Sequence, residues 1–349
     1  MGVRWDGQRV DAIDRDALPG LEGRSGLLRT FDTPEFRDMQ FLEVTSRTAL
    51  NKVPGNGFMG GAWTINPYRG CQHACVYCFA RGTHTYLELD SGRDFDTRVV
   101  VKTNVAQALD AELSRMRERP ERVMLGTNTD PYQRAEGRYR LLPGIIGTLA
   151  RHGVGMSILT KGSLLRRDLP LLTEVAERVP VEIALSIAVF DDDLQHSIEP
   201  GTPTTAARLT TVRAVREAGF GCTVLMMPVM PWLTDTEEHL DRAFAALADA
   251  GATSVSASAL HLRPGAREWY LAWLEREHPA LLPRYRELYA GGANAEREYR
   301  RWLGERIRTV RGRHRLQVHD GLWRRARSEP VSAAEPPTTE PTAVEATLF

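Results

Sequence analysis

Short runs of apolar and β-branched residues alternate along the chain with longer segments in which apolar positions recur at helical spacing. The runs predict buried strands over residues 62–68, 123–127, 155–160, 181–187, 222–229 and 254–260. Each run is followed by a segment long enough for a helix, which makes six βα units. Repeated βα units place parallel strands side by side with helices outside them, so the sequence predicts an α/β fold.

Helix start signals support this division. Thr202 followed by Pro203 predicts a helix start, because threonine caps helices and proline fits the first turn. Thr234 with Glu237 three residues later is typical of a capping box, and Asn104 is a further candidate cap.

Six βα units can form an open doubly wound sheet or a barrel, and periodicity alone does not separate the two. No GxGxxG follows the first predicted strand, which disfavours a dinucleotide-binding sheet. Polar segments follow the strands at 66–75, 126–133, 159–163, 185–193, 227–235 and 259–265. In either architecture the carboxyl ends of the strands carry the chemistry.

The ends of the chain differ in composition from the βα region. We predict an irregular N-terminal lead-in at 1–55, a core barrel at 56–295, an arginine-rich helical extension at 296–327 and a disordered tail at 328–349. The formal net charge is zero and 26% of residues are charged, as in an ordinary soluble protein. The N-terminus lacks a signal peptide's apolar run, and no stretch approaches the roughly 18 apolar residues of a membrane span. We therefore expect a cytoplasmic protein without a membrane partner.

Arginine supplies nearly all of the positive charge, since Lys52, Lys102 and Lys161 are the only lysines. The extension at 296–327 holds eleven arginines with Trp302 and Trp323 among them. Such a segment can bind a nucleic-acid backbone or form a packed amphipathic helix with a solvated face. The sequence leaves both interpretations open.

Three of the four cysteines, Cys71, Cys75 and Cys78, form a CxxxCxxC pattern after the first strand. A structural zinc site would need a fourth ligand, for which His73 and Cys222 are the candidates. An iron–sulfur cluster is the second possibility, because thiolates are its standard ligands. Three thiolates on a four-iron cube leave one iron open for another molecule. The third possibility is that these three cysteines have no function.

The CxxxCxxC pattern, with aromatic Tyr77 directly before the last cysteine, resembles the signature of the radical S-adenosylmethionine (SAM) superfamily. The resemblance implies a partial (β/α)6, TIM-like barrel whose open cluster iron binds SAM. It also implies a [4Fe-4S] cluster, reductive cleavage of SAM to a 5′-deoxyadenosyl radical, and an electron donor such as flavodoxin or ferredoxin. The six βα units, predicted separately from periodicity, agree with this fold.

The stretches at 125–139, 158–169 and 185–220 resemble the spore photoproduct lyase and "DNA repair photolyase" group. The chain is most similar to an actinobacterial radical SAM family with the same YRGC, ALNKVP and HLR stretches. The resemblance implies SAM contacts for six residues: Tyr77, Thr127, Asn128, Thr129, Lys161 and Ser186. Lys161 could pair with the SAM carboxylate or instead with a nearby acid such as Asp130.

One departure from that group concerns the hydrogen donor. The lyases carry a hydrogen-donating cysteine at the end of strand two, where this chain has Thr127, a poor donor. Lyase chemistry by the same mechanism is therefore not expected. Cys222 could replace that cysteine only if it faced the barrel interior, and its place at the start of a strand argues against this.

Substrate contacts are expected from His261 and Arg263, which follow the sixth strand and could hold a phosphate or carboxylate. Alternatively, Arg263 pairs with Glu268 at a helix start. Phe79 is expected to line the barrel mouth.

The sequence thus predicts a radical SAM enzyme of unidentified substrate, with nucleic acid favoured by the resemblance. The alternatives are modification of a peptide or small metabolite, and a non-catalytic nucleic-acid-binding protein with a structural metal. The last five residues, Glu345 to Phe349, resemble a motif that docks on the replication sliding clamp, with glutamate in place of the usual glutamine.

Overall fold

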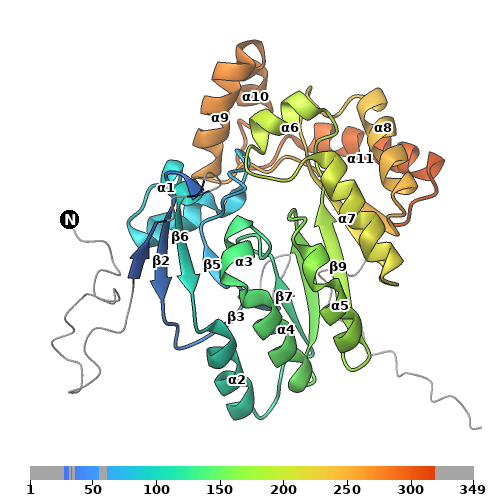
Figure 1. The fold of residues 1–349 in the computed structure, drawn as a ribbon. Helices are drawn as coiled ribbons and strands as arrows, with labels where there is room; N and C mark the ends of the chain where they lie inside the picture. Colours follow the sequence, from blue (N-terminus) through green and yellow to red (C-terminus); the bar gives the residue numbers. More distant parts are fainter. Residues whose placement is uncertain (1–26, 31–32, 34–35, 55–60, 319–349) are drawn as a thin grey trace, which may run out of the picture.

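The computed structural model describes residues 27–30, 33, 36–54 and 61–318. Its larger sheet has the strand order β11-β10-β9-β8-β7-β4-β3 (Figure 1). Six strands pair in parallel: β4 (Trp63–Ile65), β7 (Arg122–Leu125), β8 (Gly155–Thr160), β9 (Val181–Ser186), β10 (Cys222–Val229) and β11 (Ser254–Ala259). β3 (Leu50–Lys52) adds an antiparallel edge beside β4. The six predicted strands are confirmed, and the architecture is a partial (β/α)6 barrel.

A second, four-stranded sheet lies beside the first, in the order β1-β2-β6-β5. Its strands are β1 (Leu27–Arg29), β2 (Gln40–Val44), β5 (Tyr68–Arg69) and β6 (Arg98–Lys102). The prediction of one strand over 62–68 is therefore wrong in part, because the chain leaves the larger sheet after β4 and joins the smaller one at β5. This change of sheet places the first cysteine two residues after β5.

Helices cover the outside of the larger sheet and its carboxyl-terminal edge (Figure 1). They are η3 (Phe79–Leu87), α1 (Arg93–Thr97), α2 (Val105–Arg115), α3 (Arg134–Tyr139), α4 (Leu141–Arg151), α5 (Leu165–Ala176), α6 (Asp192–Ile198), α7 (Thr205–Glu217), α8 (Glu237–Asp249), α9 (Ala266–Glu277), η4 (Pro279–Leu281), α10 (Leu282–Leu288) and α11 (Arg297–Arg313). The largest core cluster packs the strands against the apolar faces of α2, α4, α5, α7 and α8. None of the described helices is both long and apolar enough to span a membrane.

Two of the three predicted helix caps, Thr202 and Thr234, lie two residues too early, whereas Asn104 does stand at the N-cap of α2. α7 is capped by Thr204, whose hydroxyl accepts from the Ala207 N–H, and α8 is capped by Thr236. Thr202 instead donates its hydroxyl to the carbonyl of Glu199 at 2.8 Å. Several threonines precede each helix, and the sequence alone does not show which of them has the extended backbone that a cap requires.

Residues 297–313 of the predicted arginine-rich extension form α11, which packs against α8 and β11, whereas its residues 319–327 lie outside the described part of the chain. Leu303, Ile307 and Val310 are its buried face. Arg313 lies beside Glu237 of α8, and Arg306 donates to the carbonyl of Asp235 at 3.0 Å. α11 is thus a packed amphipathic helix, whereas the predicted tail at 328–349 lies outside the described residues.

Candidate functional site

The predicted site residues gather at the carboxyl-terminal edge of the parallel strands. Thr127, Asn128 and Thr129 follow β7, Lys161 directly follows β8, and Ser186 is the last residue of β9. Cys222, in contrast, is the first residue of β10 and therefore lies at the opposite edge. As expected from the sequence, Cys222 is not placed to take part in chemistry at the strand ends.

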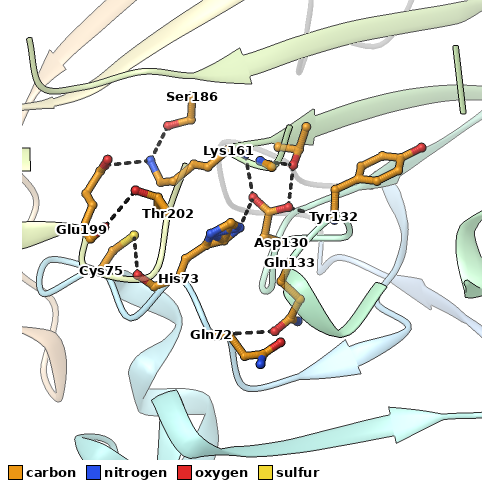
Figure 2. A network of polar contacts seen from close by, with 12 residues as sticks. Gln72, His73, Cys75, Asp130, Tyr132, Gln133, Lys161, Ser186, Glu199 and Thr202 are labelled. Atoms are coloured by element: carbon orange, nitrogen blue, oxygen red, sulfur yellow. Dashed lines mark hydrogen bonds and ion pairs between the residues drawn. The ribbon is translucent and has the colours of Figure 1, made fainter. Parts of the chain in front are cut away.

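The cysteine loop, residues 70–78, is tied to its surroundings through its backbone. Gly70 has a φ of 82°, and a Cβ at this position would lie 2.8 Å from the carbonyl oxygen of Arg98. The N–H of Gln72 donates to the side chain of Gln133 at 3.0 Å, and that side chain donates back to the carbonyl of Gly70 at 3.2 Å (Figure 2). These bonds fasten the start of the loop to the segment that follows β7.

The far side of the cysteine loop is fastened to the segment after α6. The N–H of Val76 donates to the carbonyl of Ile198 at 3.0 Å, and the N–H of Gly201 donates to the carbonyl of His73 at 3.1 Å. The two backbones approach so closely that a Cβ on Gly201 would lie 1.8 Å from the carbonyl oxygen of Gln72. Only glycine fits at position 201 without moving the cysteine loop.

Arg81, three residues after the last cysteine, is fully buried and holds the loop from beneath. Its guanidinium donates to the carbonyl of Cys75 at 3.0 and 3.1 Å, to that of Ala74 at 3.2 Å and to that of Gly92 at 2.9 Å. It also pairs with Asp96 at 2.9 Å. A buried arginine bonded to several carbonyls fixes the path of a loop, and the sequence analysis missed this residue.

We expect Arg81→Met to loosen the cysteine loop, because it removes every one of these hydrogen bonds and leaves Asp96 unpaired. The expected loss of folding stability is about 2–4 kcal/mol. The reconstituted variant should also release iron to a chelator faster than the wild type. Met at the exposed Arg93, in the neighbouring helix α1, is the matched control and should do neither. Unchanged iron release in Arg81→Met would show that the loop is held by other contacts.

Lys161, Glu199 and Arg208 form the main charged network of the site, and Figure 2 shows the contacts of Lys161 with Glu199 and Ser186. The Lys161 Nζ donates to the Ser186 hydroxyl at 2.6 Å and lies 3.2 Å from a Glu199 carboxylate oxygen. The other Glu199 oxygen lies 2.7 Å from the Arg208 guanidinium. The Tyr77 hydroxyl also donates to Glu199, so one carboxylate connects the cysteine loop with two cations.

Asp130, which the sequence offered as an acidic partner for Lys161, does not pair with its ammonium group. The ammonium group pairs with Glu199, whereas Asp130 accepts the backbone N–H of Lys161 at 2.6 Å. Glu199 and Arg208 form an ion pair, and both side chains are fully buried. Burial alone raises the pKa of Glu199, but Arg208 and Lys161 together lower it to about 2. Glu199 is therefore ionised at neutral pH.

Asp130 organises the loop after β7. It accepts from the N–H of Tyr132 at 2.9 Å and from the Thr160 hydroxyl at 2.5 Å. Its carboxylate also lies 3.4 Å from the ring of His73, in the cysteine loop. Burial lowers the pKa of His73 to about 4, so this imidazole is neutral near pH 7.

The three residues predicted from the GTNTD stretch differ in availability. The Thr127 hydroxyl donates to the side chain of Asn66 at 3.4 Å, and the Thr129 hydroxyl donates to the carbonyl of Tyr68 at 3.2 Å. Both threonines are buried, whereas Asn128 is exposed. Of the three side chains, the amide of Asn128 is therefore the one open to a ligand. Asn66, which also accepts from the N–H of Asn128 at 3.3 Å, was not found from the sequence.

His261 and Arg263 lie in the loop between β11 and α9, at the same edge of the barrel. The Arg263 Nε donates to the His261 Nε2 at 3.1 Å. Glu268, the alternative partner considered for Arg263, instead accepts from the N–H of Gly265 at 2.6 Å and so caps α9. The two candidate substrate residues are therefore brought together, next to Phe79.

The cysteine loop fits a bound group by two observations. Cys78 packs against the cluster that contains Cys71 and against the cluster that contains Cys75, and burial raises the pKa of all three thiols. The Nδ1 of His73 and the Nε2 of Gln72 are buried without a hydrogen-bond partner in the described part of the chain. Orphaned buried polar atoms point to a missing ligand.

Across residues 27–30, 33, 36–54 and 61–318, no three His, Cys, Asp or Glu side chains converge on a single metal-ion position. A four-iron cube makes a different demand, because its cysteines bind separate irons. The three neighbouring thiols of the cysteine loop match the type and number of ligands that such a cluster needs from the protein.

Six parallel strands in βα order, with a CxxxCxxC loop after the first of them, define a partial barrel of the radical SAM class. The chain belongs to the radical SAM superfamily, whose sequence pattern matches residues 65–264. Enzymes of this superfamily use a [4Fe-4S] cluster and SAM, and these are the cofactors of this protein.

Relatives cover nearly the whole chain. It is 51% identical over 351 residues to an uncharacterised protein of Mycobacterium tuberculosis, across 99% of this chain and 100% of the relative. A protein of Methanocaldococcus jannaschii is 26% identical over 201 residues, or 57% of this chain and 71% of that protein.

Among solved structures, the chain is similar to spore photoproduct lyase complexed with dinucleoside spore photoproduct. The TM-score is 0.57 at 15% identity, over 78% of this chain and 79% of the lyase. A lyase variant with bound AdoMet and the same dinucleoside gives a TM-score of 0.53 at 15% identity, over 72% and 74% of the two chains. At this identity the likeness shows the fold.

Proposed function

We propose that Cys71, Cys75 and Cys78 ligate the [4Fe-4S] cluster of this radical SAM enzyme. The observation that carries the assignment is the construction of the cysteine loop. It presents three neighbouring thiols and is fastened by Gln133, Ile198 and Arg81. A loop fixed in this way can hold three ligand atoms in place without reorganising when the cluster binds.

SAM is proposed to bind between the cysteine loop and the strand ends, through Tyr77, Thr127, Asn128, Thr129, Lys161 and Ser186. The Lys161 ammonium is the natural partner for the SAM carboxylate, since it is partly exposed and already oriented by Ser186 and Glu199. Asn128 offers an exposed amide, and the two buried threonines fix its loop. When bound, cluster and SAM supply a radical that abstracts hydrogen from carbon. The barrel walls exclude water and stray reductant from that reaction.

Nucleic acid is the substrate class we propose for the abstraction. The proposal is supported by the fold shared with spore photoproduct lyase, whose solved complexes contain a dinucleoside. Because fold does not fix function, it needs a test of its own. Thr127 stands where the lyases carry their hydrogen donor, and its hydroxyl donates to Asn66, so we do not propose lyase chemistry by that mechanism.

The test follows the abstracted hydrogen. Wild-type protein is reconstituted without oxygen and incubated with SAM, dithionite and deuterated DNA, RNA or a mixture of peptides. We expect deuterium to appear in 5′-deoxyadenosine from a nucleic acid, because the abstracted atom is carried in that product. Deuterium from the peptides alone would instead support the alternative, modification of a peptide or small metabolite.

Two partner predictions stand beside this proposal. Reductive SAM cleavage needs an electron donor, for which flavodoxin or ferredoxin is proposed. The predicted sliding-clamp motif, Glu345 to Phe349, lies outside the described residues and stays a prediction.

A further inference from the structure

Arg263 is held in one orientation at the barrel mouth. Its Nε donates to the His261 Nε2 at 3.1 Å, and its guanidinium carbon lies 5.6 Å from the centre of the Phe79 ring. On its other side, the His261 Nδ1 lies 2.9 Å from the Asn294 Oδ1. A side-chain carbonyl oxygen only accepts hydrogen bonds, so Nδ1 carries the proton and Nε2 is free to accept from Arg263.

This arrangement leaves the terminal nitrogens of the Arg263 guanidinium available to a ligand. Its Nε is bound to His261 and its guanidinium lies over Phe79, and within the described residues its two terminal nitrogens make no hydrogen bond. No carboxylate in the described part of the chain lies within ion-pair distance of them, and Glu268, the nearby acid, caps α9. An exposed arginine without an acidic partner, fixed before any ligand arrives, is arranged to bind an anion with two parallel hydrogen bonds.

The backbone around Arg263 is as firmly placed as its side chain. The N–H of Leu262 donates to the carbonyl of Ala293 at 2.8 Å, and His261 pairs with Asn294 in an isolated antiparallel bridge. A Cβ on Gly265 would lie 3.3 Å from the Cα of Gly82, so the loop packs closely on η3. The oriented guanidinium is therefore rigidly connected to the element that begins directly after Cys78.

Phe79 supplies the second half of the surface. It is the residue after Cys78, and 49% of its side chain is exposed although it is large and apolar. Part of its ring is covered by Arg263, and the rest is open to solvent. In proteins that bind single-stranded nucleic acid, exposed aromatic rings stack on unpaired bases while neighbouring arginines bind the phosphates.

We propose that Arg263, oriented by His261, binds a backbone phosphate of a single-stranded nucleic acid while Phe79 stacks on the adjoining base. The site, named here the Arg263–Phe79 site, would hold the strand beside the cysteine loop. The inference rests on the proposed function, because it gives that enzyme its substrate class. A single strand fits better than a duplex, since stacking on Phe79 needs an unpaired base face.

The experiment uses the holoprotein and a short fluorescent single-stranded thymidine oligonucleotide, with affinity measured by anisotropy at several salt concentrations. Arg263→Gln should bind roughly tenfold more weakly, since it loses a charge-assisted contact. It should also lower the salt slope by about 0.7, the value of one phosphate contact on a single strand. Arg276→Gln removes the same charge about 15 Å further along α9 and should keep the wild-type slope.

Three further arms test the parts of the site. His261→Ala should weaken binding but keep the slope, because the charge remains while its orientation is lost. Phe79→Leu should weaken binding of a peptide nucleic acid of the same sequence, which has bases but no phosphates. Thymidine monophosphate should compete only weakly if the site reads a strand; competition as strong as that of the oligonucleotide would overturn the strand and leave a free nucleotide as the ligand.

Equal slopes in Arg263→Gln and Arg276→Gln would place the phosphate contacts elsewhere and overturn the inference. So would wild-type protein that forms 5′-deoxyadenosine but binds no oligonucleotide, and in that case the radical chemistry stands. If the protein binds the oligonucleotide but takes up no iron, the Arg263–Phe79 site stands and the proposed function is contradicted.

Discussion

Cys75→Ala protein, reconstituted without oxygen, is expected to fall from about four bound irons per chain to near none, with sulfide lost in parallel. The reason is the geometry of the cysteine loop. The three thiols lie together on the loop, and no fourth cysteine stands near them to take over, since Cys222 begins β10 at the opposite edge of the barrel. Removing one of three ligands leaves the cluster without a stable attachment.

Cys222→Ala is the matched control for that measurement. Cys222 is a fully buried thiol in the main core, where burial raises its pKa to about 12, as for a small apolar residue. The substitution should cost about 1 kcal/mol of stability and leave the iron content unchanged. Iron lost equally from both variants would mean that Cys75 has no special part in binding it.

Glu199→Gln is expected to destabilise the fold by about 3–5 kcal/mol, enough to lower the thermal midpoint by roughly 5 °C. The substitution keeps the shape of the side chain but leaves the buried guanidinium of Arg208 and the ammonium of Lys161 without their counter-charge. Glu177→Gln, at the exposed end of α5, removes the same charge and should shift the midpoint little. Equal midpoints for the two variants would contradict the structural role of Glu199.

The difference in stability between wild type and Glu199→Gln should depend on pH in a defined direction. The folded pKa of Glu199, about 2, lies below the ordinary value of 4.5, so the ionised carboxylate stabilises the folded state. Its contribution is present in full above about pH 4.5 and is lost as the pH falls toward 2. The stability gap between wild type and Glu199→Gln should therefore narrow across that window, and a gap independent of pH would argue against an ionised Glu199.

The sequence predicted the larger sheet well because its strands are buried on both faces. Runs such as Gly155–Thr160 and Cys222–Val229 are almost continuously apolar, and their predicted bounds match the structure. β6 was missed although three valines stand in a row there. It lies outside the larger sheet and pairs with β2, more than fifty residues earlier, so local pattern gave no hint of its partner.

Site residues could be predicted from the sequence where the residue type alone points to a chemical role. Residues whose role depends on how they pack could not be predicted in this way. The cysteines, Lys161 and Ser186 could be located from motif and strand ends. Arg81 looked like one of many arginines, and only its burial beneath the loop reveals its role. The structure was also needed to show that Glu199 pairs with both Arg208 and Lys161.

The most direct test is to incubate reconstituted wild-type protein with SAM and dithionite and to measure 5′-deoxyadenosine together with iron and sulfide. We predict about four irons per chain and formation of 5′-deoxyadenosine, with both lost in Cys75→Ala. A protein that binds zinc instead and leaves SAM intact would contradict the assignment of the cysteine loop to a catalytic cluster.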